Sequence, residues 1–290
     1  MLMGIVLREL TVRNHGHTPI HADVRTCVPH QARPLVIVCH GFLAYKRWGF
    51  FPHLSERLAE AGFHVLTMSF SMNGVDEETG IFSRPHEFAR NTVSTEIEDI
   101  RRVCRFVRAQ RLPAEAPVSG LWGLMGHSRG AAVAMLAAHE FEEVRSIVTW
   151  SALGTLDRYT ARRKAAWRRN GALVFSDERS PGPLALNYAY YEDIDAHREA
   201  FNLPRTASAL RIPHLLVHGE RDGAATLRET TTLMQVNRDS AAHLEVIHGA
   251  GHTFNTRHPM HRPTPALDQA VKLTTDWFTG TLMTERKEEP

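Results

Sequence analysis

The sequence predicts an α/β fold: a mostly parallel eight-stranded sheet flanked by helices, with a small cap insertion. Apolar segments with the composition of strands alternate with segments in which apolar residues recur at helical spacing. Such alternation is typical of a parallel sheet with helices on both faces. One long segment, residues 151–209, breaks the alternation. With 290 residues and 43% hydrophobic side chains, the chain is large enough to bury one extensive core.

Eight segments are predicted to be strands. Residues 5–12 and 20–28 alternate apolar and polar side chains, which indicates a half-buried antiparallel pair at the start of the sheet. Residues 34–39 form a continuous, largely β-branched run, typical of a strand covered on both faces. The remaining predicted strands are residues 63–70, 118–125, 144–150, 212–218 and 244–247.

Five segments have the apolar spacing of helices that pack on the sheet. The clearest is residues 92–111, whose apolar side chains fall on one face. Before it, residues 73–90 are polar and irregular, and they predict a long loop over the strand ends. Functional side chains are expected in such loops, because open parallel sheets bind ligands beyond the carboxyl ends of their strands. The other predicted helices are residues 48–61, 131–138, 225–235 and 266–278.

The chain is predicted to form one core domain with an insertion. Residues 1–150 and 210–283 make up the core, and residues 151–209 form a cap above the sheet. A charged tail, residues 284–290, is expected to be disordered.

Two features of the predicted cap's composition are unusual: a run of basic residues and a large number of aromatic residues. Its basic run, Arg158 to Arg169, favours a solvated helix face over a site for an anionic ligand. Its aromatic residues are too numerous for a solvated loop, and most of them are expected to hold the cap to the core. At least one of Tyr188, Tyr190 and Tyr191 is expected to line a substrate pocket.

The overall composition excludes several classes of function. A net charge of +2 gives no field that would attract nucleic acid or a membrane surface. No apolar run approaches the roughly 20 residues needed to span a bilayer, and the first residues lack the features of a signal peptide. Cys27, Cys39 and Cys104 are scattered through apolar segments, so we expect reduced thiols and a cytoplasmic protein. Neither a cofactor nor a metal is expected, and the oligomeric state stays open between monomer and homodimer.

A Gly-x-Ser-x-Gly turn at residues 126–130 is the strongest motif. It lies between the predicted strand 118–125 and an alanine-rich helical segment. Strand, turn and helix in this order are the context of a nucleophile elbow, in which the two glycines permit the tight turn. We therefore predict that Ser128 is a nucleophile with its hydroxyl above the sheet.

A serine nucleophile needs a base and a carboxylate that orients the base. In the fold that carries this elbow, the acid follows the serine and the histidine comes last. Asp222 follows the predicted strand 212–218 on a glycine-flanked turn, and it is favoured over Glu220, which leaves the strand too early. His252, in a glycine-rich loop after the last strand, is favoured as the base over the strand-end His248.

An oxyanion hole is the remaining requirement for acyl transfer. In this fold one backbone N–H comes from the residue after the nucleophile, which is Arg129. The second is expected from the loop after the strand 34–39, where the Phe42 amide is the candidate. Gly41 allows the backbone to approach closely, and His40 is expected to brace the loop.

These residues resemble the α/β-hydrolase superfamily over nearly the whole chain. Within it the chain is similar to bacterial serine esterases of the cinnamoyl/feruloyl esterase type and to dienelactone-hydrolase-like proteins. The resemblance implies Ser128 as nucleophile, His252 as base and Asp222 as orienting acid, with the amides of Phe42 and Arg129 as oxyanion donors. The motifs that carry it are His40-Gly41-Phe42, Glu96-Ile97-Glu98-Asp99, Gly126-His127-Ser128-Arg129-Gly130, His218-Gly219-Glu220-Arg221-Asp222, Gly249-Ala250-Gly251-His252-Thr253-Phe254 and Val271-Lys272-Leu273-Thr274-Thr275-Asp276-Trp277-Phe278.

The chain departs from these esterases at three places. Ser71-Met72-Asn73-Gly74 stands where Arg-Gly-His-Gly is usual, and Arg129 replaces the more common glutamine or methionine. The cap is short and basic, which puts a phenolic-ester pocket in doubt. A serine nucleophile also argues against the dienelactone hydrolases themselves, which use cysteine, and against dehalogenases, which use aspartate.

The sequence therefore predicts a serine carboxylesterase that hydrolyses small to medium esters, including aryl or hydroxycinnamoyl esters, through an acyl-enzyme. Two alternatives remain. A small peptidase or amidase would use the same residues on a different bond. A non-catalytic hydrolase fold that serves as a binding module is less favoured, because all three residues of the triad are present.

Overall fold

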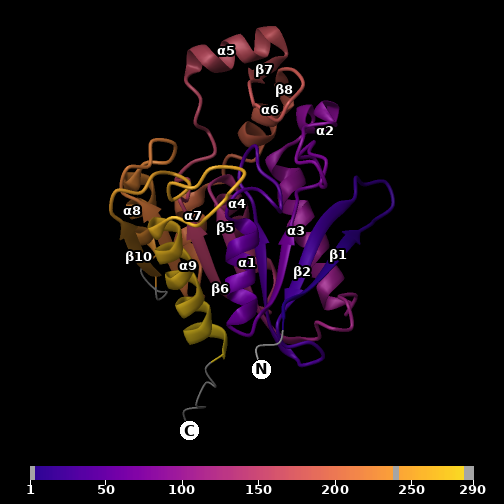
Figure 1. The fold of residues 1–290 in the computed structure, drawn as a ribbon. Coiled ribbons are helices and arrows are strands. Elements are labelled where there is room, and N and C mark those ends of the chain that lie inside the picture. Colours follow the sequence, from indigo (N-terminus) through magenta and orange to yellow (C-terminus); the bar gives the residue numbers. More distant parts are fainter. Residues whose placement is uncertain (1–3, 238–241, 284–290) are drawn as a thin grey trace.

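The computed structural model describes residues 4–237 and 242–283, so the charged tail at 284–290 lies outside the described residues. Eight strands form one sheet in the order β1-β2-β4-β3-β5-β6-β9-β10 (Figure 1). β2 pairs antiparallel with both β1 and β4, and the remaining neighbours pair in parallel. The predicted α/β fold with a mostly parallel eight-stranded sheet is confirmed. The strands are β1 (Val6–Val12), β2 (Ile20–Thr26), β3 (Arg33–Cys39), β4 (His64–Met68), β5 (Val118–His127), β6 (Val144–Trp150), β9 (His214–Gly219) and β10 (Ala242–Ile247).

Helices cover both faces of this sheet. One buried apolar cluster lies between one face and helices α1 and α9, which pack on each other. A second cluster lies on the opposite face, beneath α3, α4, α7 and α8. Figure 1 shows α1 and α9 together in front of the strands. The helices of the core are α1 (Phe51–Glu60), α3 (Val93–Arg108), α4 (Arg129–Ala137), α7 (Leu203–Ala209), α8 (Leu227–Val236) and α9 (Pro265–Phe278).

The segment 73–90 corrects one expectation. It contains a short helix, α2 (Pro85–Ala89), where the polar and irregular sequence predicted only a loop. Pro85 lies at the start of this helix, where its missing N–H costs nothing, and the buried Phe88 holds the turn against the apolar core. A single amphipathic turn is too short to produce a visible apolar period.

The cap insertion stands above the carboxyl ends of the strands (Figure 1). It contains α5 (Ala161–Asn170), a hairpin of β7 (Ala172–Phe175) and β8 (Leu184–Asn187), and α6 (Ala189–Ala196). Trp167 of α5 is buried and donates its indole N–H to the Leu186 carbonyl at 2.8 Å, so the cap has a small core of its own. Helix α7, at the end of the segment, packs instead against α4 and α8 of the core domain. In the part of the chain that the structure describes, no helix is long and apolar enough to cross a membrane.

A buried charge cluster joins β2 to the loop that follows β3. Asp23 is fully buried, and its carboxylate forms ion pairs with the buried Lys46 and, at 2.9 Å, with the guanidinium of Arg47. Arg25 lies 3.6 Å from the same carboxylate. Asp23 therefore faces three neighbouring cations, of which Arg47 also pairs with Glu9.

Asp23→Asn is predicted to destabilise the fold by about 3–5 kcal/mol, because it keeps the shape of the side chain but leaves buried cations without their anion. Urea denaturation followed by circular dichroism measures this change in the free energy of unfolding. Asp276→Asn is the matched control: its ion pair with Lys272 is exposed (60% and 74%), so removing that charge is expected to cost less than about 1 kcal/mol. Equal effects of the two variants would contradict the prediction.

Candidate active site

The Gly-x-Ser-x-Gly turn connects the end of β5 directly to α4. Ser128 adopts φ 55° and ψ −119°, a strained conformation for a residue with a side chain. A Cβ atom on Gly130 would lie 2.2 Å from the His40 carbonyl oxygen, and one on Gly126 would lie 2.4 Å from the Gly130 oxygen. Only glycine fits at both positions, so the turn holds Ser128 at the amino end of α4, as the elbow motif predicts.

Three side chains from three loops meet at this turn. His252 Nε2 lies 2.9 Å from Ser128 Oγ, and His252 Nδ1 lies 2.8 Å from Asp222 Oδ2. A carboxylate only accepts hydrogen bonds, so Nδ1 of the neutral imidazole carries the proton and Nε2 is free to accept one. The arrangement can therefore take the proton from the Ser128 hydroxyl.

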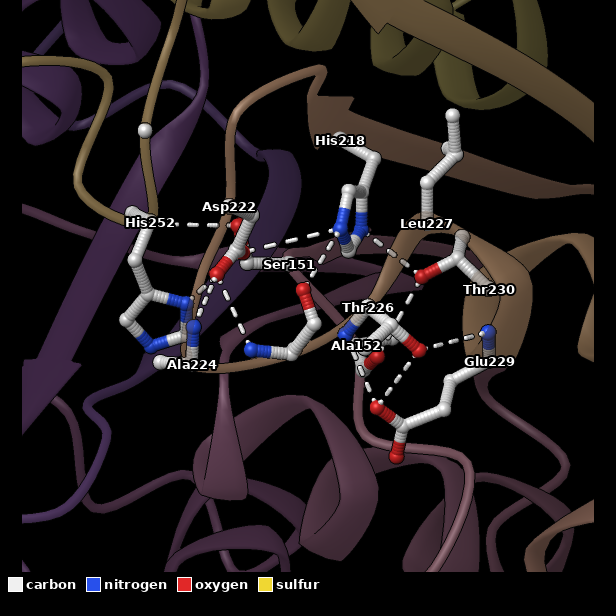
Figure 2. Close-up of polar contacts among 12 residues, drawn as sticks. Ser151, Ala152, His218, Asp222, Ala224, Thr226, Leu227, Glu229, Thr230 and His252 are labelled. Atoms are coloured by element: carbon white, nitrogen blue, oxygen red, sulfur yellow. Dashed lines mark hydrogen bonds and ion pairs between the residues drawn. The ribbon is translucent and has the colours of Figure 1, made fainter.

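Asp222 is held in place from several directions (Figure 2). Its Oδ1 accepts the backbone N–H groups of Ala224 and Ala225 at 2.8 and 2.9 Å. On its other side, His218 Nε2 lies 3.5 Å from Oδ2. Burial raises the pKa of Asp222, but the hydrogen bond from His252, the charge of that ring and the two amides outweigh it and hold the pKa at about 2. The carboxylate is therefore charged at neutral pH.

The backbone of His252 is also fixed. Its carbonyl oxygen accepts from His127 Nε2 at 2.9 Å and from Ser151 Oγ at 3.1 Å. Burial lowers the pKa of His127 to about 3, so its ring is neutral and the single N–H lies on the nitrogen that faces the carbonyl. Sequence reasoning did not find these two donors, because a contact across the sheet leaves no local pattern.

The rival acid and base lie away from Ser128. Glu220 accepts the Gly249 N–H at 2.9 Å, and its other oxygen lies 3.3 Å from His248 Nδ1. The side chain of His248 is 87% exposed. These two residues pair with each other at the surface, so the geometry favours Asp222 and His252.

The loop after β3 lies beside Ser128. A Cβ on Gly41 would lie 3.2 Å from Ser128 Cβ. His40 Nε2 accepts the Phe70 N–H at 3.0 Å, so Nδ1 carries the ring proton and donates it to the Gly41 carbonyl at 2.8 Å. In a trans peptide the C=O and the N–H point in opposite directions, so this bond also aims the N–H of Phe42.

A cavity of about 380 Å³ opens above Ser128. Tyr190 lines it, whereas Tyr188 and Tyr191 do not; they pack around Trp167 with ring centroids 6.0 and 6.5 Å away. Tyr190 also stacks on Trp167 at 6.2 Å, and it is the one of the three predicted residues that lines this cavity, so its role in substrate binding stays a prediction. The lining residues are Phe42, Leu43, Ala44, Trp48, His127, Ser128, Arg129, Leu153, Leu156, Arg158, Tyr159, Asp177, Arg179, Tyr190, Ala224, His252 and Thr253.

Arg129 forms part of the cavity wall. Its Nη2 donates to the fully buried Glu96 of α3, and its guanidinium lies over the Phe42 ring at 4.6 Å. The sequence singled out Arg129 for its backbone N–H and as a replacement of the more common glutamine or methionine, but it did not predict this ion pair. The available signal for the ion pair was Glu96, a carboxylate between the apolar positions Val93, Ile97 and Ile100 of the predicted helix 92–111.

Comparisons with known proteins agree with this fold. The model of the alpha/beta hydrolase family matches residues 36–266. Among solved structures, Est1E from Butyrivibrio proteoclasticus with ferulic acid bound is similar (18% identity, TM-score 0.69, 95% of this chain and 100% of that chain). So are an esterase domain from Rhodothermus marinus (20%, 0.63, 95% and 99%) and a dienelactone hydrolase from Anabaena variabilis (16%, 0.60, 96% and 99%). A search of curated proteins gave no match.

Gly130→Ala is predicted to destabilise the fold by more than about 3 kcal/mol or to prevent folding, because the added methyl group would overlap the His40 carbonyl. Urea denaturation of the purified variant checks this. Gly182→Ala is the control, since Gly182 is exposed and has no atom within 4 Å of a built Cβ. A Gly130 variant as stable as the Gly182 variant would show that the turn can relax.

Proposed function

Because the chain belongs to the alpha/beta hydrolase family, we propose that it is a serine carboxylesterase acting on small to medium esters. The observation that carries the proposal is the continuous chain of contacts from Ser128 through His252 to Asp222, whose side chain is fully buried. The charged Asp222 carboxylate accepts from His252 Nδ1, which leaves Nε2 of a neutral imidazole able to accept the Ser128 proton, as nucleophilic catalysis requires.

The proposed reaction begins with attack of Ser128 Oγ on the ester carbonyl while His252 Nε2 takes the hydroxyl proton. The oxygen of the tetrahedral intermediate accepts from the N–H groups of Phe42 and Arg129. His252 then returns the proton to the leaving alcohol, and the acyl group stays on Ser128. A water molecule repeats the sequence: His252 takes its proton, the acid is released and Ser128 Oγ is protonated again.

The walls of the cavity support medium-sized substrates with apolar or aromatic groups. Phe42, Trp48 and Tyr190 line the cavity, together with the aliphatic Leu153 and Leu156 of the cap. Ferulic acid is bound in Est1E, and aryl or hydroxycinnamoyl esters are therefore included in the proposed substrate class. An amidase with the same three residues is the alternative, and substrate panels separate the two.

Ser128→Ala is predicted to lower kcat by roughly 10⁴- to 10⁶-fold without loss of fold, because the covalent intermediate can no longer form. Hydrolysis of p-nitrophenyl and hydroxycinnamoyl esters, beside aminoacyl anilides, measures the activity, and a fluorophosphonate probe reports the nucleophile. Faster turnover of anilides than of esters would favour the amidase. Persistent labelling of another serine would exclude Ser128.

Asp222→Asn is predicted to reduce kcat by about 10⁴-fold, because an amide at this position leaves the imidazole of His252 in the wrong tautomer. Glu220→Gln is the matched control, since it removes a carboxylate from the same loop without touching His252. Steady-state kinetics of both variants on one ester decide between them. If Glu220→Gln is the more damaged enzyme, the assignment of the acid is wrong.

A further inference from the structure

The hairpin of the cap carries an arginine that reaches the loop beside the nucleophile. Arg179 lies in the turn between β7 and β8, and both nitrogens on one edge of its guanidinium bind Asp177: Nε donates to Oδ1 at 2.9 Å and Nη2 to Oδ2 at 2.8 Å. The same Nη2 donates to the backbone carbonyl of Leu43. A paired guanidinium of this kind is fixed in its plane, so the direction of its bond to Leu43 is fixed as well.

The cap side of this contact is anchored independently. The Arg179 carbonyl accepts the Phe82 N–H at 3.0 Å, and its guanidinium carbon lies 5.0 Å from the centroid of the buried Phe82 ring. The side chains of Arg179 and Asp177 are only 17% and 15% exposed, which limits screening of their charges. Arg179 is therefore a rigid point of attachment.

The residue that Arg179 holds has a strained backbone. Leu43 has φ 56°, in the left-handed region that bulky side chains rarely adopt. Such a strained conformation persists only where several surrounding contacts stabilise it, and the hydrogen bond from Arg179 is one of these contacts. Leu43 directly follows Phe42, whose N–H is the proposed oxyanion donor.

Phe42 thus lies between two fixed carbonyl groups. His40 of the core holds the carbonyl of Gly41, and Arg179 of the cap holds that of Leu43. The cap also touches Phe42 itself, since the Phe175 ring of β7 lies 4.9 Å from its ring in an edge-to-face arrangement. The loop around Phe42 is therefore contacted by residues of both the core domain and the cap insertion.

We propose that Arg179, held by Asp177, is a positioning residue of the oxyanion hole, so that the cap contributes directly to stabilising the transition state. The proposal rests on the serine-esterase function proposed above. It differs from a role in substrate binding, because the guanidinium acts on the Leu43 carbonyl and through it on the Phe42 N–H. A displacement of about 1 Å in a catalytic group is enough to reduce turnover by about 10²-fold.

Arg179→Ala is expected to lower kcat by roughly 10- to 100-fold while KM changes by less than about 3-fold, because the lost stabilisation appears only in the transition state. Arg179→Lys, which keeps one donor for the Leu43 carbonyl, is expected to recover at least a third of that loss on a logarithmic scale. An increase of KM with kcat unchanged would overturn the proposal, since it would make Arg179 a residue for substrate binding.

The rate of phosphonylation by a small fluorophosphonate tests the same point without an ester substrate. Ser128 Oγ forms the bond to phosphorus, fluoride leaves and His252 takes the hydroxyl proton, while a phosphonyl oxygen occupies the oxyanion hole. We expect this rate to fall in Arg179→Ala in parallel with kcat, when measured on protein shown to be folded by its thermal unfolding curve. An unchanged rate per folded molecule would leave Arg179 a purely structural role and overturn the proposal.

Arg162→Ala is the matched control, because it removes an exposed positive charge from α5 of the same cap, and it should label at the wild-type rate. An equal slowing in both variants would assign the effect to the charge of the cap and overturn the positioning role. If wild-type Ser128 is not labelled at all, the proposed serine-esterase function fails first. If the wild type and Arg179→Ala are labelled at the same rate, the inference about Arg179 is wrong, whereas the proposed serine-esterase function is unaffected.

Discussion

The close approach of the elbow turn to the end of β3 is the constraint on which the rest of the site depends. The backbone at Gly130 comes so near the His40 carbonyl that no side chain fits between them. This approach brings the nucleophile beside the loop that follows β3, and it buries the two histidines that flank the contact, His40 and His127. Burial lowers the pKa of each ring to about 3, so both stay neutral.

Because the His40 and His127 rings are neutral, they hold the neighbouring loops by hydrogen bonds without adding a positive charge. Each has a single N–H, and each donates it to a backbone carbonyl of an active-site loop: His40 to Gly41 and His127 to His252. The His127 and His252 rings lie only 4.8 Å apart, and a second imidazolium at that distance would oppose protonation of the base. The Asp222 carboxylate is therefore the charge that bears directly on His252.

The core of the site could be predicted from sequence because its residues occur where strands end. Ser128, Asp222 and His252 each follow a recognisable strand, and the order of the three along the chain is diagnostic. The role of the cap could not be predicted in this way. Tyr190 lines the cavity and Tyr191 does not, although they are adjacent and both pack on Trp167: the Arg129 guanidinium lies over the Tyr190 ring, and the Lys164 ammonium lies over the Tyr191 ring. The contact from Arg179 to Leu43 joins segments 136 residues apart, and neither contributes a motif.

Arginines of the cap contact two irregular loops of the core: the loop after β9, which carries Asp222, and the loop after β3, which carries Phe42. Arg158, at the start of the cap, pairs with Glu229 of α8 and donates to the Ala224 carbonyl, while the N–H of Ala224 binds Asp222. Arg179 pairs with Asp177 of the cap itself and donates to the Leu43 carbonyl in the loop that bears Phe42. The loop that carries Asp222 and the loop that carries Phe42 thus each contact an arginine of the insertion. If the proposed function holds, sequence changes in this cap are expected to act on the geometry of catalysis as well as on the shape of the cavity, because Arg158 and Arg179 also line that cavity.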